Sequence, residues 1–206
     1  MNLLRRASWF FGKGYSRKHF EKLYSGTARD AWRYEQGEFT RLRFDMLAEM
    51  LPQASIGAVL EVGCAEGHFT RILALRAKQV VACDISELAI QRSKQNCLGL
   101  RNVQFIRADV RKGLPIGFFD LILCSDVLYY LSKKEAVHVL ESFARSLRPG
   151  AFLLFSNEWQ ANYRCLLNPQ EAFGLISHAG VWKKLRSEEI KYDDQRVLSV
   201  GLFRKN

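Results

Sequence analysis

The sequence predicts an α/β fold in which helices cover both faces of a doubly wound, mostly parallel sheet. The first observation is an apolar run, Ile56–Val62, that passes through a glycine-rich turn into a segment whose apolar residues recur at helical spacing. The second is that short apolar or alternating runs follow at 79–83, 102–106, 119–125 and 151–155. Since helical patterns separate several of these runs, the order indicates strands alternating with helices, which is typical of a parallel sheet.

The turn after the first run has the composition of a backbone that bends sharply. Glu61 lies at the end of the run, and Gly63, Ala65 and Gly67 follow at alternate positions. Glycine adopts conformations that a Cβ atom disfavours, and it lets a ligand approach the backbone closely. A strand, such a turn and a helix are the opening of a nucleotide-binding βαβ unit.

Three acidic residues follow three consecutive predicted strands. Asp84 ends the second strand, Asp109 follows the third and Asp126 follows the fourth. Because the carboxyl ends of parallel strands meet at one edge of the sheet, we expect the three carboxylates to lie at the same edge. Asp84 stands where an acidic side chain accepts hydrogen bonds from both hydroxyls of a ribose, and Asp109 stands where an adenine would lie.

These motifs together resemble the class I S-adenosylmethionine-dependent methyltransferases. The resemblance extends from about residue 30 to the C-terminus and is carried by Glu61-x-Gly63-x-Ala65-x-Gly67, Asp84, Ala108-Asp109, Phe119-Asp120-Leu-Ile and Leu147-Arg-Pro149-Gly150. Dinucleotide dehydrogenases share the first turn, but their turn usually has glycine in place of Ala65, and Pro149-Gly150 is not part of their pattern. The resemblance implies a Rossmann-like, seven-stranded sheet in the order 3-2-1-4-5-7-6 with strand 7 antiparallel. It also implies S-adenosyl-L-methionine as cofactor and S-adenosyl-L-homocysteine as product.

A narrower resemblance is to the NodS family, which N-methylates the free amine of a deacetylated chitooligosaccharide in nodulation-factor synthesis. It is carried by Asp30-Ala-Trp32-Arg33 with Phe39 and Arg43, by 62–70, and by Ser125-Asp126-Val-Leu128-Tyr129-Tyr130-Leu131. The family usually has proline in place of Ala31 and glutamate in place of Asp126. Asp126 keeps the carboxylate and shortens it by one methylene, so the acceptor class stays open between sugars and other small amines.

The resemblance assigns the cofactor to one edge of the sheet and to the helical segment before it. The implied cofactor-binding residues are Trp32, Arg43, Glu61, Gly63, Cys64, Ala65, Gly67, Phe69, Asp84, Ile85, Asp109, Val110 and Ser125. Ile85 and Val110 would sandwich the adenine, whose amino group would donate to Asp109. Arg43 would pair with the carboxylate of the methionine moiety. No metal is expected.

Asp126 is the predicted catalytic residue, because it directly follows the fourth strand. An amine acceptor needs a free lone pair, so a carboxylate beside the methyl group serves as base or orienter. Tyr129, Tyr130 and Trp159 are the predicted acceptor-binding residues, since sugars and ammonium groups favour aromatic faces. A plainer alternative for Asp126 is a helix-capping or lid-pairing carboxylate, and one of the two tyrosines is expected to point into the core.

The length of 206 residues indicates one domain. Residues 1–20 are a basic aromatic segment for which mobility and packing on the domain both stay open, and 21–206 are the methyltransferase-like domain. Within it we expect a helical lid at 21–52 and a Rossmann-like core at 53–206. The lid contains a helix from about Glu38 to Leu51 that Pro52 ends.

Later elements have clear signals as well. Ser132 begins a helix whose expected buried face is Ala136, Val137, Leu140, Phe143, Ala144 and Leu147. Pro149-Gly150 is expected to turn the chain into the fifth strand. Two alternating stretches at 182–192 and 196–204 predict a closing β-hairpin.

The composition bounds the remaining alternatives. The net charge is +10 and is spread along the chain, and we interpret it as a solvated basic surface. The charge also supports an alternative function, methylation of RNA. A cofactor-binding domain without catalytic activity is a further alternative. The Asn/Asp-Pro-Pro-Tyr/Phe tetrapeptide that is typical of nucleobase-amine methylation is absent, and Ser125-Asp126-Val-Leu occupies its place.

No apolar run approaches the length of a membrane span. The five cysteines lack metal-like spacing, so we expect them to be reduced and the protein to be cytoplasmic. The oligomeric state stays open.

Overall fold

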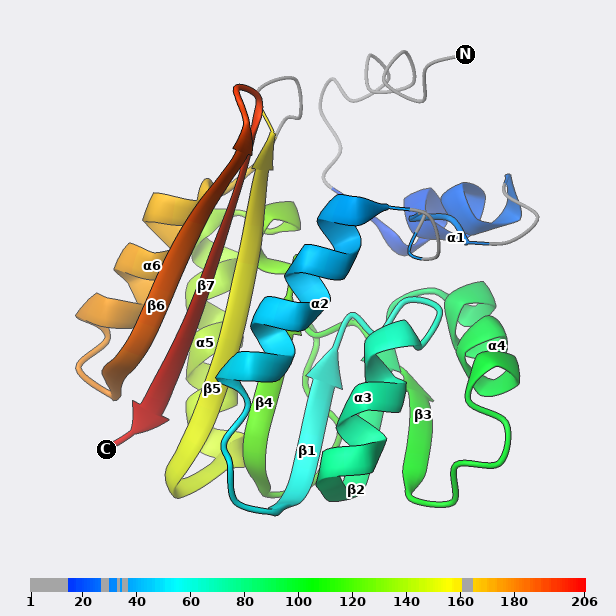
Figure 1. Cartoon of the computed structure of the whole chain (residues 1–206), viewed down its shortest axis with the longest axis horizontal. Coiled ribbons are helices and arrows are strands. Elements are labelled where there is room, and N and C mark those ends of the chain that lie inside the picture. Colours follow the sequence, from blue (N-terminus) through cyan, green and yellow to red (C-terminus); the bar gives the residue numbers. More distant parts are fainter. Residues whose placement is uncertain (1–14, 27–29, 33, 35–36, 161–164) are drawn as a thin grey trace.

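The computed structural model describes residues 15–26, 30–32, 34, 37–160 and 165–206. Its centre is one seven-stranded sheet in the order β3-β2-β1-β4-β5-β7-β6 (Figure 1). The strands are β1 (Ile56–Val62), β2 (Ala77–Asp84), β3 (Val103–Arg107), β4 (Phe119–Ser125), β5 (Leu147–Gln160), β6 (Trp182–Asp193) and β7 (Arg196–Lys205). β7 is antiparallel to both of its neighbours, and the other neighbouring pairs are parallel. The predicted fold class, strand order and strand direction are confirmed.

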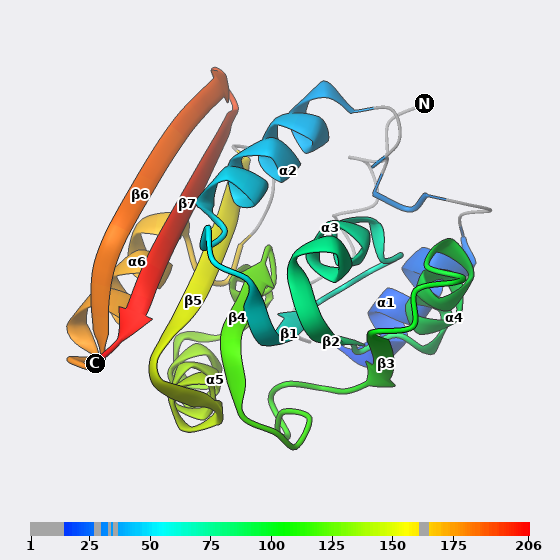
Figure 2. The same cartoon turned by 60° about the horizontal axis from the view of Figure 1, so that its bottom comes forward.

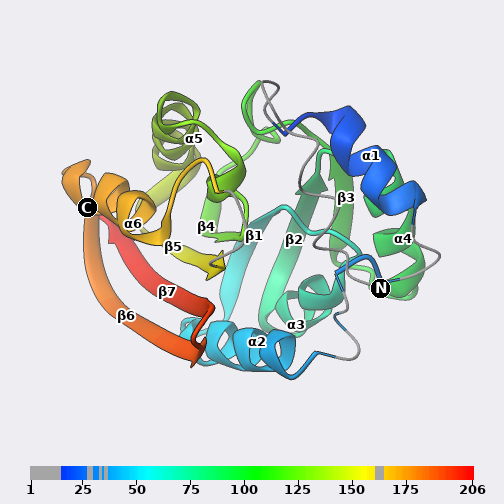
Figure 3. The ribbon, with the colours of Figure 1, turned by 90° about the horizontal axis from the view of Figure 1, so that it is seen from above.

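Helices form a layer on each face of the sheet. They are α1 (Arg17–Ser25), α2 (Glu38–Met50), α3 (His68–Arg76), α4 (Glu87–Asn96), the short 3₁₀ helix η2 (Leu128–Tyr130), α5 (Lys133–Ser146) and α6 (Pro169–His178). Figures 2 and 3 show α2 and α3 on one face and α5 and α6 on the other. α1 packs against α4 near the end of the sheet that β3 forms (Figure 3).

Side-chain alternation along β5 divides the core between the two faces. Leu153 and Phe155 belong to the apolar cluster that contains residues of α5 and α6, whereas Leu154 belongs to the cluster that contains residues of α2 and α3. Successive side chains of a strand point to opposite faces, so the even-numbered residues of β5 face α2. This alternation decides which residues at the end of β5 reach the site described below.

Two predicted helix starts have the expected caps. The hydroxyl of Ser86 accepts from the backbone N–H of Ala89 at 3.2 Å. Ser132 and Glu135 form a capping box at the start of α5. Both arrangements satisfy backbone donors that the first helical turn leaves without partners.

Three sequence expectations need correction. On α5 the buried valine is Val139 and not Val137, which is 38% exposed, because Val139 lies one turn before Phe143 on the same face. Pro149-Gly150 does not precede the fifth strand but lies inside β5, where the pairing with β4 shifts register and Gly150 has a φ of +76°. The boundary expected after residue 20 falls inside α1, which runs from Arg17 to Ser25. Residues 1–14 of the predicted N-terminal segment lie outside the described residues.

Candidate cofactor and acceptor site

One cavity of about 570 Å³ lies at the carboxyl ends of β1, β2 and β4, with residues of α1 and α2 among its lining. It brings together most of the predicted site residues: Trp32, Arg43, Glu61, Gly63, Cys64, Ala65, Phe69, Asp84, Ile85, Asp109, Val110, Ser125, Asp126, Tyr129 and Tyr130. Gly67 and Trp159 are the two predicted residues that do not line it. The volume is within the range that small-molecule and cofactor sites occupy.

The turn after β1 is held in left-handed backbone conformations. Gly63 and Ala65 have φ of +76° and +49°. A Cβ at Gly63 would lie 2.4 Å from a methyl group of Val127, so only glycine fits there. Gly67, at the start of α3, has a φ of +80°, and a Cβ there would lie 3.0 Å from side-chain atoms of Ser93 and Cys97. Gly67 therefore serves the packing of this turn against α4 rather than the approach of a ligand.

Asp84 fixes this turn from the end of β2. One carboxylate oxygen accepts from the backbone N–H of Ala65 at 3.1 Å, and the other accepts from that of Ser86 at 2.9 Å. Burial raises the pKa of Asp84 to about 6 despite these hydrogen bonds. Glu61 lies deeper, where its carboxyl accepts from the hydroxyl of Thr70, and burial raises its pKa to about 8.

Asp109 is already paired. Both of its oxygens accept from the guanidinium of Arg111, at 2.8 Å each, and although burial acts in the other direction, these bonds hold the pKa of Asp109 below its ordinary value. Arg111 also donates to the backbone carbonyl of Tyr15 at 3.1 Å and lines the cavity. The sequence analysis missed Arg111. A carboxylate oxygen has two lone pairs, so Asp109 keeps the capacity to accept from a ligand.

Arg43 of α2 lies between two carboxylates. Its Nη1 is 2.6 Å from Oδ2 of Asp126, and its Nη2 is 2.5 Å from Oε2 of Glu158. The backbone N–H of Glu158 also donates to Oδ1 of Asp126 at 2.7 Å, so the two acids belong to one hydrogen-bonded unit. Burial raises the pKa of Glu158, against the opposing charge of Arg43. The lid-pairing alternative for Asp126 is thus the arrangement found here.

The sequence analysis missed Glu158, although it lines the cavity. β5 does not stop at Phe155 but continues to Gln160. Glu158 is therefore still part of the strand, and as the second even-numbered residue after Leu154 it faces α2. Trp159 stands at the next position, is partly buried and pairs with Val197 of β7. By alternation it belongs to the opposite face, which explains why it does not line the cavity.

Tyr129 and Tyr130 both line the cavity, and both are also buried members of the apolar cluster that contains Phe20 and Tyr24. The hydroxyl of Tyr129 donates to that of Tyr130 at 3.1 Å. The ring of Tyr130 packs edge-on against Phe20 of α1, with centroids 5.0 Å apart. Trp32 donates from its indole nitrogen to the hydroxyl of Tyr24 at 2.8 Å.

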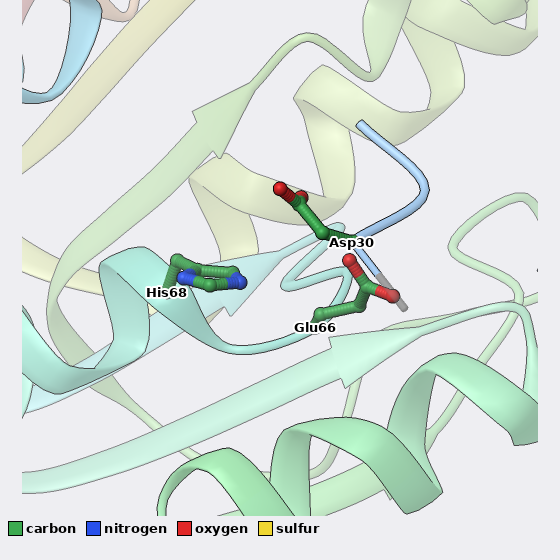
Figure 4. A group of neighbouring side chains, drawn as sticks. All are labelled: Asp30, Glu66 and His68. Carbon is green, nitrogen blue, oxygen red and sulfur yellow. The ribbon is translucent and has the colours of Figure 1, made fainter. Parts of the chain in front are cut away.

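Asp30, Glu66 and His68 come together where the turn leads into α3, with potential metal ligands within 4.8 Å of one another (Figure 4). The carboxylate of Glu66 already has a cation, since one oxygen lies 2.7 Å from Nη1 of Arg92. Its other oxygen accepts from the backbone N–H of Ala31 at 3.0 Å. Glu66 therefore joins the segment before α2 to the turn and to α4, which is sufficient to explain its burial.

No helix among the described residues is long and apolar enough to cross a membrane.

The sheet order, the antiparallel β7 and the cavity at the carboxyl strand ends define the Rossmann-like fold of class I methyltransferases. The N-methyltransferase NodS of Bradyrhizobium japonicum WM9, solved with S-adenosyl-L-homocysteine, superposes with a TM-score of 0.81 at 22% identity over 90% of this chain and 97% of that chain. The model of the family described as Nodulation protein S (NodS) matches residues 19–177. This chain belongs to the NodS family.

Curated relatives agree with this placement. Nodulation protein S of Sinorhizobium fredii is 35% identical over 139 residues, which are 66% of this chain and 64% of that protein. Nodulation protein S of Rhizobium tropici is 34% identical over 137 residues, 66% of this chain and 58% of that protein. The matches thus cover a little under two thirds of the length of these two relatives. Phosphoethanolamine N-methyltransferase 3 of Arabidopsis thaliana is 32% identical over 108 residues, 51% of this chain and 22% of that protein.

Proposed function

We propose that this protein is an S-adenosyl-L-methionine-dependent N-methyltransferase that acts on an amine of a small molecule or an amino sugar. The observation that carries the proposal is the single cavity in which the glycine turn, Asp84 and the pair Arg43–Asp126 come together among the described residues. The names of the relatives support it, because N-methyltransferase NodS was solved with S-adenosyl-L-homocysteine. A deacetylated chitooligosaccharide is the acceptor that family membership favours.

The residues present fit the cofactor. Gly63 has a left-handed backbone and no Cβ that would meet Val127, and residues 63–65 line the cavity, so the methionine moiety can lie against this stretch of backbone. Asp84 would accept from the ribose hydroxyls, and Ile85 and Val110 would hold the adenine between them. Arg43, whose Nε is buried without a hydrogen-bond partner among the described residues, would pair with the methionine carboxylate.

When bound, the cofactor supplies a methyl group on a cationic sulfur, which an in-line nucleophile takes. The protein's own part is to orient the acceptor lone pair and to exclude water. Asp126 accepts the amine proton or orients the amine, since it follows β4 directly and lines the cavity. Tyr129 and Tyr130 form the wall on which the acceptor packs. α1 and α2 together serve as the lid over the carboxyl edge of the sheet.

The first test is transfer of labelled methyl to deacetylated chitin oligomers, with total RNA and fully N-acetylated oligomers as parallel acceptors. We expect label on the deacetylated oligomers alone. Label on RNA would instead favour the second candidate, an RNA methyltransferase, for which the net charge of +10 is the supporting observation. Absence of cofactor binding in calorimetry would contradict both and favour a different use of the cavity.

We also propose that the protein works in the cytoplasm. Its five cysteines are free, and four of them are buried. Free buried thiols are ordinary in reducing compartments, where they pack as small apolar side chains. Fractionation of cells that contain the protein tests this: we expect it in the cytoplasmic fraction, and its recovery in another fraction would contradict the proposal.

A further inference from the structure

Arg43 holds a position in the cavity that a ligand cation could also hold. It comes from α2, whereas the carboxylates that it joins, Asp126 and Glu158, follow β4 and lie near the end of β5. These two acids are connected independently of Arg43, through the backbone N–H of Glu158 and Oδ1 of Asp126. Removal of the guanidinium would therefore leave two adjacent carboxylates in place.

The guanidinium is not fully satisfied where it lies. The side chain is 10% exposed, and its Nε is buried with no hydrogen-bond partner among the described residues. A buried unpaired donor of this kind is unfavourable. Two adjacent buried carboxylates without a cation would be more unfavourable still. Once Arg43 pairs with another anion, the two carboxylates are therefore left needing a second cation, and their affinity for one rises.

We propose that Arg43 occupies the acceptor's ammonium site in the cofactor-free protein, and that Asp126 and Glu158 bind a primary ammonium once Arg43 pairs with the cofactor carboxylate. The inference rests on the proposed function and deepens it. Glu158 becomes a specificity-determining residue beside Asp126, and the cofactor binds before the acceptor. The acceptor class is then a cationic primary amine, because two carboxylates repel carboxylates and phosphates and prefer an ammonium to a neutral hydroxyl or amide.

The wild-type protein supplies the first experiment. Fully deacetylated chitotetraose is titrated by calorimetry into the cofactor-free protein and into the protein saturated with S-adenosyl-L-homocysteine, which allows no turnover. We expect the affinity for the oligomer to be at least about tenfold higher in the saturated protein, a difference of about 1.4 kcal/mol. Fully N-acetylated chitotetraose is the control and should bind no more tightly with the product than without it. Equal affinities for the deacetylated oligomer in both states would contradict the proposed exchange, in which the acceptor's ammonium replaces Arg43 beside the two carboxylates.

Two variants test the exchange without reference to catalysis. In cofactor-free Arg43→Gln the carboxylates have lost their internal cation, so the oligomer should bind at least about tenfold more tightly than to cofactor-free wild type. In Glu158→Gln the oligomer should bind more weakly to the saturated protein, while S-adenosyl-L-homocysteine should bind as tightly as in wild type or more tightly, because Arg43 has lost a competing partner. A merely structural role for Glu158 would weaken both.

The outcomes separate the two proposals. If wild type binds no S-adenosyl-L-homocysteine, the proposed function fails, but cofactor-free Arg43→Gln still tests whether Arg43 blocks an ammonium site. If the product binds and Arg43→Gln gains no affinity for the oligomer, the exchange alone is wrong. Arg43→Lys retains a cation and is the matched control, which should not gain affinity. Circular dichroism confirms folding, and should Arg43→Gln not fold, the wild-type and Glu158→Gln titrations decide.

Discussion

Glu61 is an acid buried in the wall of the cavity that we propose binds a cationic cofactor. Its pKa is raised from its ordinary 4.5 to about 8, chiefly by burial. The folded protein therefore binds more protons at this residue than the unfolded chain does between those two values. The contribution of Glu61 to the free energy of unfolding is therefore fully present below about pH 4.5 and is lost as the pH rises through about 8.

We expect Glu61→Gln to remove this dependence. As the pH rises from 5 to 8.5, the free energy of unfolding of the wild type should fall relative to that of the variant. The fall should be about 1.4 kcal/mol for each pH unit between the two pKa values. Urea unfolding at several pH values measures the difference. The amide keeps the shape of the side chain and an acceptor for the hydroxyl of Thr70, so a constant offset with no slope in pH would show that Glu61 is ionised in the folded protein.

Asp84 accepts from two backbone N–H groups and, in the proposed complex, from the ribose. We expect Asp84→Ala to weaken binding of S-adenosyl-L-homocysteine by about 1–3 kcal/mol, the cost of leaving buried donors without an acceptor. Calorimetry measures the affinity. Asp120→Ala is the matched control, because Asp120 accepts from the backbone N–H of Ala58 at 2.7 Å but does not line the cavity. It should lose stability and keep its affinity, and an equal loss of affinity in both variants would contradict the role of Asp84.

Among the helices, α1 is joined to α4 by polar contacts. The carboxylate of Glu21 accepts from the hydroxyl of Ser86 at 3.0 Å and from the backbone N–H of Glu87 at 2.7 Å. It thus satisfies donors at the start of α4 and places a negative charge at the positive end of that helix. Tyr24, also on α1, accepts from Arg92 through its carbonyl at 2.8 Å.

We expect Glu21→Gln to lower the free energy of unfolding by about 0.5–1 kcal/mol, because it removes the charge that the helix terminus favours while keeping an acceptor. Glu87→Gln, which changes an exposed acid in the same helical turn, is the control for the charge alone and should cost less. Both are measured by urea unfolding at low ionic strength. If Glu87→Gln costs as much as Glu21→Gln, the contact between the two helices contributes nothing beyond a nearby charge.

These elements show which features the sequence could predict. Asp84, Asp109 and Asp126 were predictable because each stands at the end of its own strand or within two residues of it, so the topology of a parallel sheet alone gathers them at one edge. Glu158 was not, since its place depends on how far β5 extends beyond its apolar residues. The contact of Glu21 with Ser86 joins residues 65 positions apart and leaves no periodic pattern in the chain. Local signals predicted the elements, and long-range polar pairs that complete the site were missed.

The net charge of the protein gives a further way to distinguish its acceptors. Exposed basic residues lie on β6, at the edge of the sheet away from β1 (Figure 3), and none of them lines the cavity: they are Lys183, Lys184, Arg186 and Lys191. A positively charged protein repels a cationic oligomer at long range, and salt screens this repulsion. The attraction of the carboxylates Asp126 and Glu158 acts at short range in a buried site, where salt screens much less.

We therefore expect kcat/KM for deacetylated chitin oligomers to stay constant or to rise when the salt concentration increases from about 50 to about 200 mM. Over the same interval, a protein that makes several phosphate contacts loses roughly 10³–10⁵ in affinity for nucleic acid. Initial rates at subsaturating acceptor measure the difference, with S-adenosyl-L-methionine saturating throughout. A steep fall with the oligomer would mean that exposed, salt-sensitive acidic groups, rather than the pair of buried carboxylates, attract the cationic acceptor, and would contradict the short-range role of Asp126 and Glu158.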